Sequence, residues 1–162
     1  ASTELDVRYF DNQINDLVSF SYVDYRLYNI EKAETKGFDI NMITQFNEWD
    51  LKLNATIQDP ENLTSNSQLL RRPKNSYGMT MRRNIGAVTL NLNIRRDSTR
   101  YDFGGLKLDA YTLMNASLIW QINQQLMINA SFNNALDEVY VLVNGYNTPK
   151  RKVFLGFNYI MN

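Results

Sequence analysis

The chain of 162 residues is long enough for one ordinary domain, and its 17 basic and 17 acidic residues give a formal charge of zero. This balance gives no reason to expect nucleic acid or an acidic substrate as a partner. The sequence has no cysteine and no histidine, which excludes disulfides, thiolate and imidazole zinc sites, and catalytic triads with a histidine base. We therefore expect no enzyme activity, no cofactor and no resident metal.

The opening of the chain, around residues 5–18, is typical of strand sequence. A basic segment followed by an apolar one is not found there, so no signal peptide is expected. No stretch approaches the roughly 20 consecutive apolar residues of a transmembrane helix. Such an opening suits a processed protein or a piece of a longer one.

Apolar and polar residues alternate along most of the chain, which is the pattern of strands with two unlike faces. For example, we expect Leu90 and Leu92 to face hydrocarbon, and Asn91 and Asn93 to face an interior. With the weaker segments around 5–18 and 111–120, we predict eight strands of about nine to twelve residues, near the length of a tilted strand crossing a bilayer. The predicted fold is all-β, an antiparallel up-and-down transmembrane β-barrel. The clearest segments are 38–42, 49–57, 77–81, 88–94, 126–132 and 153–159.

The connections between these segments alternate strictly in length. Bacterial outer-membrane barrels have short turns at the periplasmic end and longer loops at the outer end. We therefore expect the long connections to lie outside the cell. The short connections are 46–48, 84–86 and 122–124, and the long ones are 21–31, 59–68, 97–107 and 136–150.

The two tryptophans stand beside short turns. Trp49 begins the segment after one turn, Trp120 ends the segment before another, and both share the parity of the apolar residues. Indole rings are enriched where hydrocarbon meets headgroups, so both are predicted membrane-interface anchors. Tyrosines near the long loops predict a second aromatic belt at the outer end, and these are Tyr22, Tyr25, Tyr28, Tyr101 and Tyr140.

The polar parity carries several charges, which favours a wide and wet interior because an unpaired buried charge costs several kcal/mol. Two basic pairs, Arg71-Arg72 and Arg95-Arg96, are candidates for gathering an anionic ligand at the outer mouth. The same pairs would also suit lipopolysaccharide phosphates or loop carboxylates. Tyr101 and Tyr146 complete the predicted set of ligand contacts.

Four motifs follow one another in a particular order. Lys-Gly-Phe-Asp at 36–39 precedes Leu-Leu-Arg-Arg-Pro-Lys-Asn-Ser at 69–76, Asn-Ala-Leu-Asp-Glu-Val-Tyr at 134–140 and Gly-Tyr-Asn-Thr-Pro at 145–149. In this order they resemble the C-terminal barrel strands of TonB-dependent outer-membrane receptors, and most of all cobalamin and siderophore receptors. The chain departs from that family at Ala135-Leu136, usually Leu-Phe, and at its last residues, Met161-Asn162, where the family ends in an aromatic residue.

The resemblance implies that residues 1–162 are the C-terminal segment of an outer-membrane barrel of about 22 strands, without its plug domain. It implies residence in a Gram-negative outer membrane, in contact with lipid and lipopolysaccharide. It also implies uptake of a small-molecule metal chelate (a siderophore) or cobalamin, energised by the TonB protein through the missing plug.

Two other interpretations stay open at this point. One is a complete small outer-membrane barrel of eight strands with a structural or adhesive role. The other is a soluble β-barrel ligand carrier. Coding sequence upstream of Ala1 in the parent gene would separate the receptor fragment from the complete small barrel.

Overall fold

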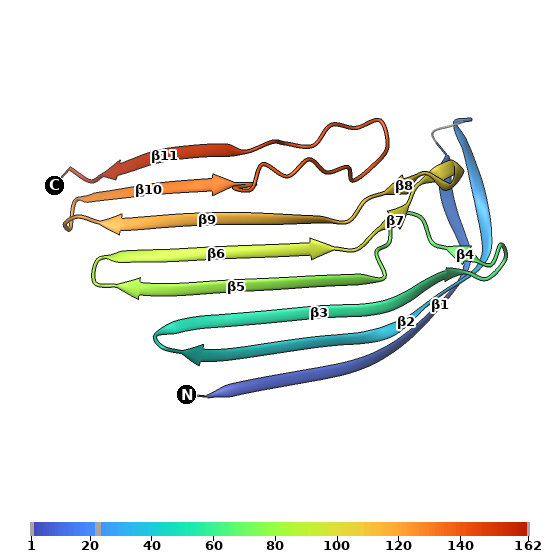
Figure 1. Cartoon of the computed structure of the whole chain (residues 1–162), viewed down its shortest axis with the longest axis horizontal. Coiled ribbons are helices and arrows are strands. Elements are labelled where there is room, and N and C mark those ends of the chain that lie inside the picture. The colour runs from blue at the N-terminus through green and yellow to red at the C-terminus, as the bar shows by residue number, and fades with distance from the viewer. Residues whose placement is uncertain (1, 22–23, 162) are drawn as a thin grey trace.

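The structure, a computed structural model, describes residues 2–21 and 24–161, and within them the chain forms one antiparallel sheet of eight long strands (Figure 1). Each long strand pairs with the next one along the chain. The predicted all-β fold and the eight strands are confirmed. The strands are β1 (Thr3–Ser21), β2 (Arg26–Phe46), β3 (Trp49–Asn62), β5 (Asn75–Ile85), β6 (Val88–Asp97), β9 (Tyr111–Gln121), β10 (Leu126–Asn133) and β11 (Lys152–Tyr159).

Smaller elements lie in the long connections. Strand β4 (Ser67–Gln68) pairs with the end of β3, while β7 (Arg100–Tyr101) and β8 (Lys107–Leu108) form a separate two-stranded ladder around the 3-10 turn η1 (Phe103–Gly105). No helix in the described part of the chain is both long enough and apolar enough to span a membrane.

The three short turns lie together at one end of the sheet, at the left of Figure 1. Asn47 and Glu48 join β2 to β3 with positive φ angles of 47° and 66°, the backbone that a tight two-residue hairpin requires. Gly86, with φ of 57°, serves the turn from β5 to β6. Before β10, the Asn123 side chain accepts hydrogen bonds of 2.9 Å from the backbone N–H groups of Gln125 and Leu126. The predicted short connections are confirmed.

The first hairpin differs from the prediction. Strands β1 and β2 contain 19 and 21 residues rather than nine to twelve, and Ser21 pairs directly with Arg26, so the expected long loop at 21–31 is wrong. Residues 11–16 are almost all polar, so alternation cannot reveal the strand there, although the backbone ladder continues. In Figure 1 the far half of this hairpin bends away and rises beyond the other strands.

Strand register divides the sheet into an apolar face and a polar face. On the apolar face, Leu53, Met79, Ile94 and Met114 are successive cross-strand neighbours. On the other face, the neighbours along the adjacent row are polar, as at Asn93, which pairs with Asn115. Within the described residues no second layer covers the apolar face, and Phe157, for example, is 81% exposed. Such a face needs an apolar environment outside the chain.

Arginine at the centre of either face tests this division. In the intact protein, we expect Leu92→Arg to lower the stability of the sheet in a bilayer by about 2–4 kcal/mol, because the guanidinium would enter hydrocarbon. Unfolding in bilayers by denaturant titration measures the change. Asn93→Arg, one residue further on the polar face, is the matched control and should change stability far less. Equal losses, or a larger loss for Asn93→Arg, would contradict the orientation.

Candidate functional site

The apolar face is a band with a sharp limit at each end. On β3 it runs from Trp49 to Ile57, and the next position of the same parity is Asp59. On β6 it runs from Val88 to Ile94 and is followed by Arg96. A band of about nine residues along a tilted strand matches the hydrocarbon thickness of a bilayer.

Aromatic side chains mark both limits of the band. At the short-turn end, the central carbon of the Arg83 guanidinium lies 5.7 Å from the centre of the Trp49 ring. Trp120, at the same end, is 45% exposed. At the other end the rings of Tyr9 and Phe38 meet edge to face, 5.3 Å apart. Both tryptophans therefore occupy positions that suit anchors at a membrane surface.

Two of the tyrosines expected to form the outer belt lie beyond that limit. Tyr25 and Tyr28 are near the tip of the β1–β2 hairpin, well beyond the band, and Tyr28 donates a hydrogen bond to Asp24. Tyr140 packs on Tyr111 in the last loop, with ring centroids 5.0 Å apart. Tyr22 is outside the described residues. The prediction of an outer belt is therefore wrong for Tyr25 and Tyr28, because β1 and β2 extend further than alternation indicated.

Beyond the band, three long connections form one packed unit, here called the loop cluster (residues 69–74, 98–110 and 134–151). Its centre is Asp102, whose carboxylate is 2% exposed and accepts hydrogen bonds of 2.8 Å from three partners. These partners are the Arg71 guanidinium and the backbone N–H groups of Phe103 and Asn144. Asp102 therefore joins segments that are far apart in the sequence.

Burial and hydrogen bonding act on Asp102 in opposite directions. Burial is the largest effect and by itself raises the pKa of this carboxyl. The hydrogen bonds from Arg71 and from the N–H groups of Asn144 and Phe103 outweigh it together, and hold the pKa below its ordinary value of 3.8. Asp102 is therefore ionised at neutral pH and keeps its ion pair.

A second buried group supports the cluster where it meets the sheet. Arg100 is 3% exposed, lies 4.9 Å from the centre of the Tyr111 ring, and donates a 2.6 Å hydrogen bond to the carbonyl of Val141. The Tyr111 hydroxyl donates to Asp97, at 2.5 Å, and Arg95 pairs with the same carboxylate at 3.1 Å. These contacts attach the last loop to the ends of β6 and β9.

Asn134 organises the base of the last loop. Its side chain donates to the carbonyls of Glu138 and Pro149 and accepts from the Glu138 N–H. The residue is buried and has φ of 51°, a left-handed conformation that asparagine tolerates. The motif at 134–140 therefore closes the loop that follows β10.

The six residues predicted to contact a ligand separate into different environments. The Arg71 guanidinium pairs with Asp102, and its central carbon lies 5.5 Å from the centre of the Phe103 ring. The backbone N–H of Arg71 donates a hydrogen bond to the carbonyl of Tyr101. Arg95 lies on the polar face, whereas Arg96 lies on the apolar face and donates to the Thr112 hydroxyl. Adjacent residues of a strand point to opposite faces, so one ligand cannot contact both side chains from the same side.

Arg72 and Tyr146 are the remaining two. Arg72 lines a hollow of about 820 Å³ on the polar face, together with Arg8, Thr56 and Gln58. Arg8 pairs with Asp39 at 2.8 Å, while no ion pair is found for Arg72 among the described residues. Tyr146, in the last loop, is 59% exposed. Among the described residues, the polar side of the loop cluster thus offers an exposed guanidinium without an ion pair, that of Arg72.

Asp102, Arg100 and Arg8 carry much of this architecture, and sequence reasoning missed all three. Asp102 and Arg71 are 31 residues apart, and no local pattern links them. Only the register of β1 against β2, which pairs Arg8 with Asp39, could have indicated the second ion pair in advance.

An antiparallel sheet with an apolar and a polar face, short turns at one end and long loops at the other, defines a segment of an outer-membrane β-barrel. The chain belongs to the TonB-dependent receptor family, because the family model described as TonB dependent receptor-like, beta-barrel, matches residues 1–135. The match covers seven of the eight long strands of the described chain.

Individual relatives agree with this assignment. The chain is 24% identical over 146 residues to the vitamin B12 transporter BtuB of Vibrio vulnificus, covering 85% of this chain and 23% of that protein. It resembles the solved siderophore receptor PiuA from Acinetobacter baumannii with a TM-score of 0.78 and 15% identity, covering 97% of this chain and 26% of that one. For the ferric-catecholate import receptor Fiu from E. coli, the TM-score is 0.75 and the identity 17%, over 97% of this chain and 25% of that one. The chain spans about a quarter of the length of the curated relatives it matches.

The central role of Asp102 can be tested by removing its charge. In the whole receptor, Asp102→Asn should cost about 1–3 kcal/mol of local stability, because the Arg71 guanidinium loses its anionic partner. Hydrogen exchange of the backbone N–H groups of Phe103 and Asn144 should become faster. Asp109→Asn is the matched control, since that carboxylate is 83% exposed beside Lys107. Unchanged exchange at Asn144 in Asp102→Asn would show that the carboxylate does not hold the loops together.

The ion pair between Asp102 and Arg71 also predicts a lower pH limit for the stability of the loop cluster. The pKa of Asp102 is lower in the folded loop cluster than in an unfolded chain, so its ionised form stabilises the cluster at any pH above about 4. The stabilisation should be lost as the pH falls through the lowered pKa. Amide protection at Asn144 should therefore be constant from neutral pH to about 5 and fall in stronger acid. Loss of protection between pH 7 and 5 would contradict this assignment.

Proposed function

We propose that these eight strands are part of the wall of an outer-membrane receptor that imports a metal chelate or cobalamin by TonB-dependent transport. The family match carries this proposal, supported by relatives whose names specify vitamin B12 or siderophores. The chain would be the C-terminal segment of a barrel of about 22 strands. The plug, and the contact with TonB, would belong to parts of the receptor outside these 162 residues.

The unpaired edges of the sheet support a larger barrel. Strands β1 and β11 each have one neighbour in the described chain, and they do not pair with each other. A strand edge in lipid leaves backbone groups without hydrogen bonds, at several kcal/mol each. Further strands of the receptor would supply the missing partners on both sides. This arrangement disfavours a complete eight-stranded barrel or a soluble carrier.

In the assembled receptor, the polar face would line the interior and the loop cluster would stand at its outer mouth. Arg95 would then meet an anionic ligand from the wall, and Arg72, Tyr101 and Tyr146 from the loop cluster. Arg71 would act indirectly by holding the loop cluster together through Asp102. The chain would bind and pass its ligand without chemical change, so we propose no enzyme activity.

Uptake by the whole receptor tests this function. In cells that lack other receptors for these ligands, it should accumulate either radiolabelled cobalamin or a radiolabelled ferric siderophore, and a deletion of TonB should abolish uptake. Uptake that persists without TonB, or no uptake of either class, would overturn the proposal. Ligand identity follows from which label accumulates.

Arg72→Gln should weaken binding of that ligand roughly tenfold, as expected for loss of one charge-assisted hydrogen bond. The affinity is measured on the purified receptor by titration calorimetry. Lys107→Gln, whose side chain lies in the outer loops beside Asp109, is the matched control and should bind as the wild type does. Equal affinities for wild type and Arg72→Gln would remove Arg72 from the ligand site.

The orientation of the barrel has its own test. A short epitope inserted between Thr64 and Ser65, in the exposed turn after β3, should be detected by antibody on intact cells. The same epitope between Gly86 and Ala87, in a short turn, should be detected only after the outer membrane is permeabilised. The reverse pattern would place the loop cluster on the periplasmic side.

A further inference from the structure

The last loop contains the only asparagine–glycine pair of the sequence, Asn144 and Gly145. Both residues are exposed, and nothing lies within 4 Å of the position that a Cβ atom on Gly145 would occupy. Across residues 2–21 and 24–161, no hydrogen bond engages the side-chain amide of Asn144 or the N–H of Gly145. The pair is therefore open to solvent and can change its local conformation without displacing a neighbour.

These two residues form the centre of a turn. The Tyr146 N–H donates a 3.1 Å hydrogen bond to the carbonyl of Val143, and Gly145 has φ of 83°. A positive φ at the third residue of a turn is the type II arrangement, which favours glycine. A single hydrogen bond between neutral groups closes this exposed turn, so local motion can open it while the rest of the loop cluster stays folded.

We propose that Asn144 is a site of spontaneous deamidation. When the turn opens, the backbone nitrogen of Gly145 attacks Cγ, the side-chain carbonyl carbon of Asn144. A bond forms between these two atoms, the bond from Cγ to Nδ2 breaks, and Nδ2 leaves as ammonia with the proton of the Gly145 N–H. Solvent water then opens the five-membered imide at either of its carbonyls, which leaves aspartate or isoaspartate at position 144.

The neighbouring glycine is what makes this position reactive. The attacking nitrogen and the attacked carbon belong to adjacent residues, so the reaction is intramolecular and requires no partner to be brought in. Glycine has no Cβ atom to crowd the forming ring, and its backbone reaches conformations that other residues avoid. Because Gly145 is also exposed, water can reach the imide for the second step.

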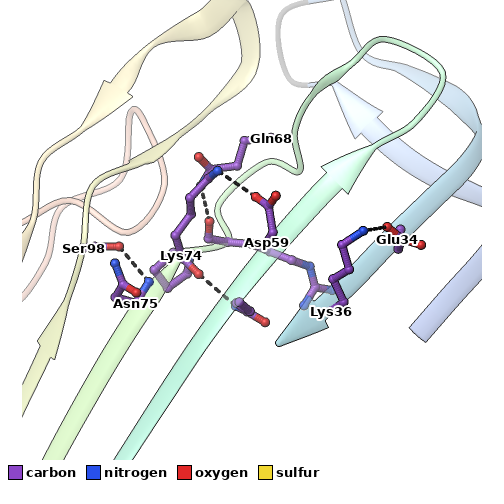
Figure 2. A network of polar contacts seen from close by, with 10 residues as sticks. Glu34, Lys36, Asp59, Gln68, Lys74, Asn75 and Ser98 are labelled. Atoms are coloured by element: carbon purple, nitrogen blue, oxygen red, sulfur yellow. Dashed lines mark hydrogen bonds and ion pairs between the residues drawn. The ribbon is translucent and has the colours of Figure 1, made fainter. Parts of the chain in front are cut away.

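Asparagine at another small residue is held more firmly. Figure 2 shows Asn75, which precedes Ser76, with its backbone N–H donating to the Ser98 hydroxyl at 3.0 Å. The Asn75 carbonyl accepts from the Ser98 N–H at 2.9 Å. Ser76 lies in β5 and is paired with strands on both sides. The ladder must open before the Ser76 nitrogen can turn onto the amide, so Asn144 should react well before Asn75.

Deamidation acts on the loop cluster through Asp102. The N–H of Asn144 donates to the Asp102 carboxylate at 2.8 Å, and that carboxylate is 2% exposed. Aspartate at position 144 adds a second negative charge beside it, and like charges disfavour each other. Isoaspartate lengthens the main chain by one carbon before Gly145, which displaces the turn that leads to Tyr146. Both products therefore loosen the loop cluster.

Peptide mapping of the purified whole receptor by mass spectrometry, after incubation for days at mildly alkaline pH, tests the modification. Fragments with Asn144 should gain the mass difference between a hydroxyl and an amino group, and an isoaspartyl methyltransferase should label them. The rate should rise with pH, because base removes the proton of the attacking nitrogen. Asn75 is the internal control and should remain an amide. An Asn144 that stays intact, or that reacts no faster than Asn75, would overturn the proposal.

Two variants connect the modification to the loop cluster. Asn144→Gln keeps an amide but requires a larger ring, so it should stay unmodified, whereas Asn144→Asp reproduces the charge of one product. Hydrogen exchange at the Phe103 N–H should be roughly threefold faster in Asn144→Asp and in aged wild type than in fresh wild type, as expected for a charge interaction near the protein surface. Ageing should not change it in Asn144→Gln. Equal exchange in fresh and fully deamidated wild type would reject the effect on the cluster.

The consequence for binding rests on the proposed function, in which Tyr146 contacts the ligand. Ageing should then weaken ligand binding by the wild type and leave Asn144→Gln unchanged. Deamidation of Asn144 in a receptor that imports neither cobalamin nor ferric siderophore would support the modification and reject only the transport proposal. A receptor that transports its ligand while Asn144 remains an amide would reject the modification alone.

Discussion

Every backbone N–H and C=O group in an apolar environment must be hydrogen-bonded within the protein, and this constraint determines the structure. The ladder from β1 to β11 satisfies it without interruption along the apolar band. Because successive side chains point to opposite faces, the same ladder separates residues such as Leu92 and Asn93 onto two surfaces. One surface then suits hydrocarbon and the other water. In the proposed receptor, further strands would meet this constraint at the two outer edges, on β1 and β11.

The loop cluster obeys a related rule outside the band. Buried polar groups there are paired across long sequence distances, and Asp102 serves three partners at once. In the proposed receptor, this packed unit would present a defined surface to a ligand, where three separate flexible loops would not. Arg72, which belongs to this cluster, lines the hollow on the polar face and has no ion pair in the described chain. Its charge is therefore available to a ligand.

The sequence predicted the sheet well wherever the two faces differ chemically, as between Val88 and Ile94, where leucines alternate with asparagines. It failed at residues 11–16 and 31–36, where β1 and β2 are mostly polar on both faces and no alternation marks the strand. The candidate site was harder to predict from the sequence, because Arg71 and Asp102 meet only through tertiary packing. The opposite orientations of Arg95 and Arg96 follow from the period of a strand, and a strict use of that period would have separated them from the start.

The central claim is that the even positions of β6 contact lipid while its odd positions face a wet interior. Single spin labels at residues 88–96 of the whole receptor in bilayers measure this, by collision with oxygen, which concentrates in lipid, and with a water-soluble nickel complex. We predict that the two accessibilities alternate in opposite phase with a period of two, with Leu90, Leu92 and Ile94 at the oxygen maxima. Equal accessibility at neighbouring positions, or maxima for oxygen at Asn91 and Asn93, would contradict the account.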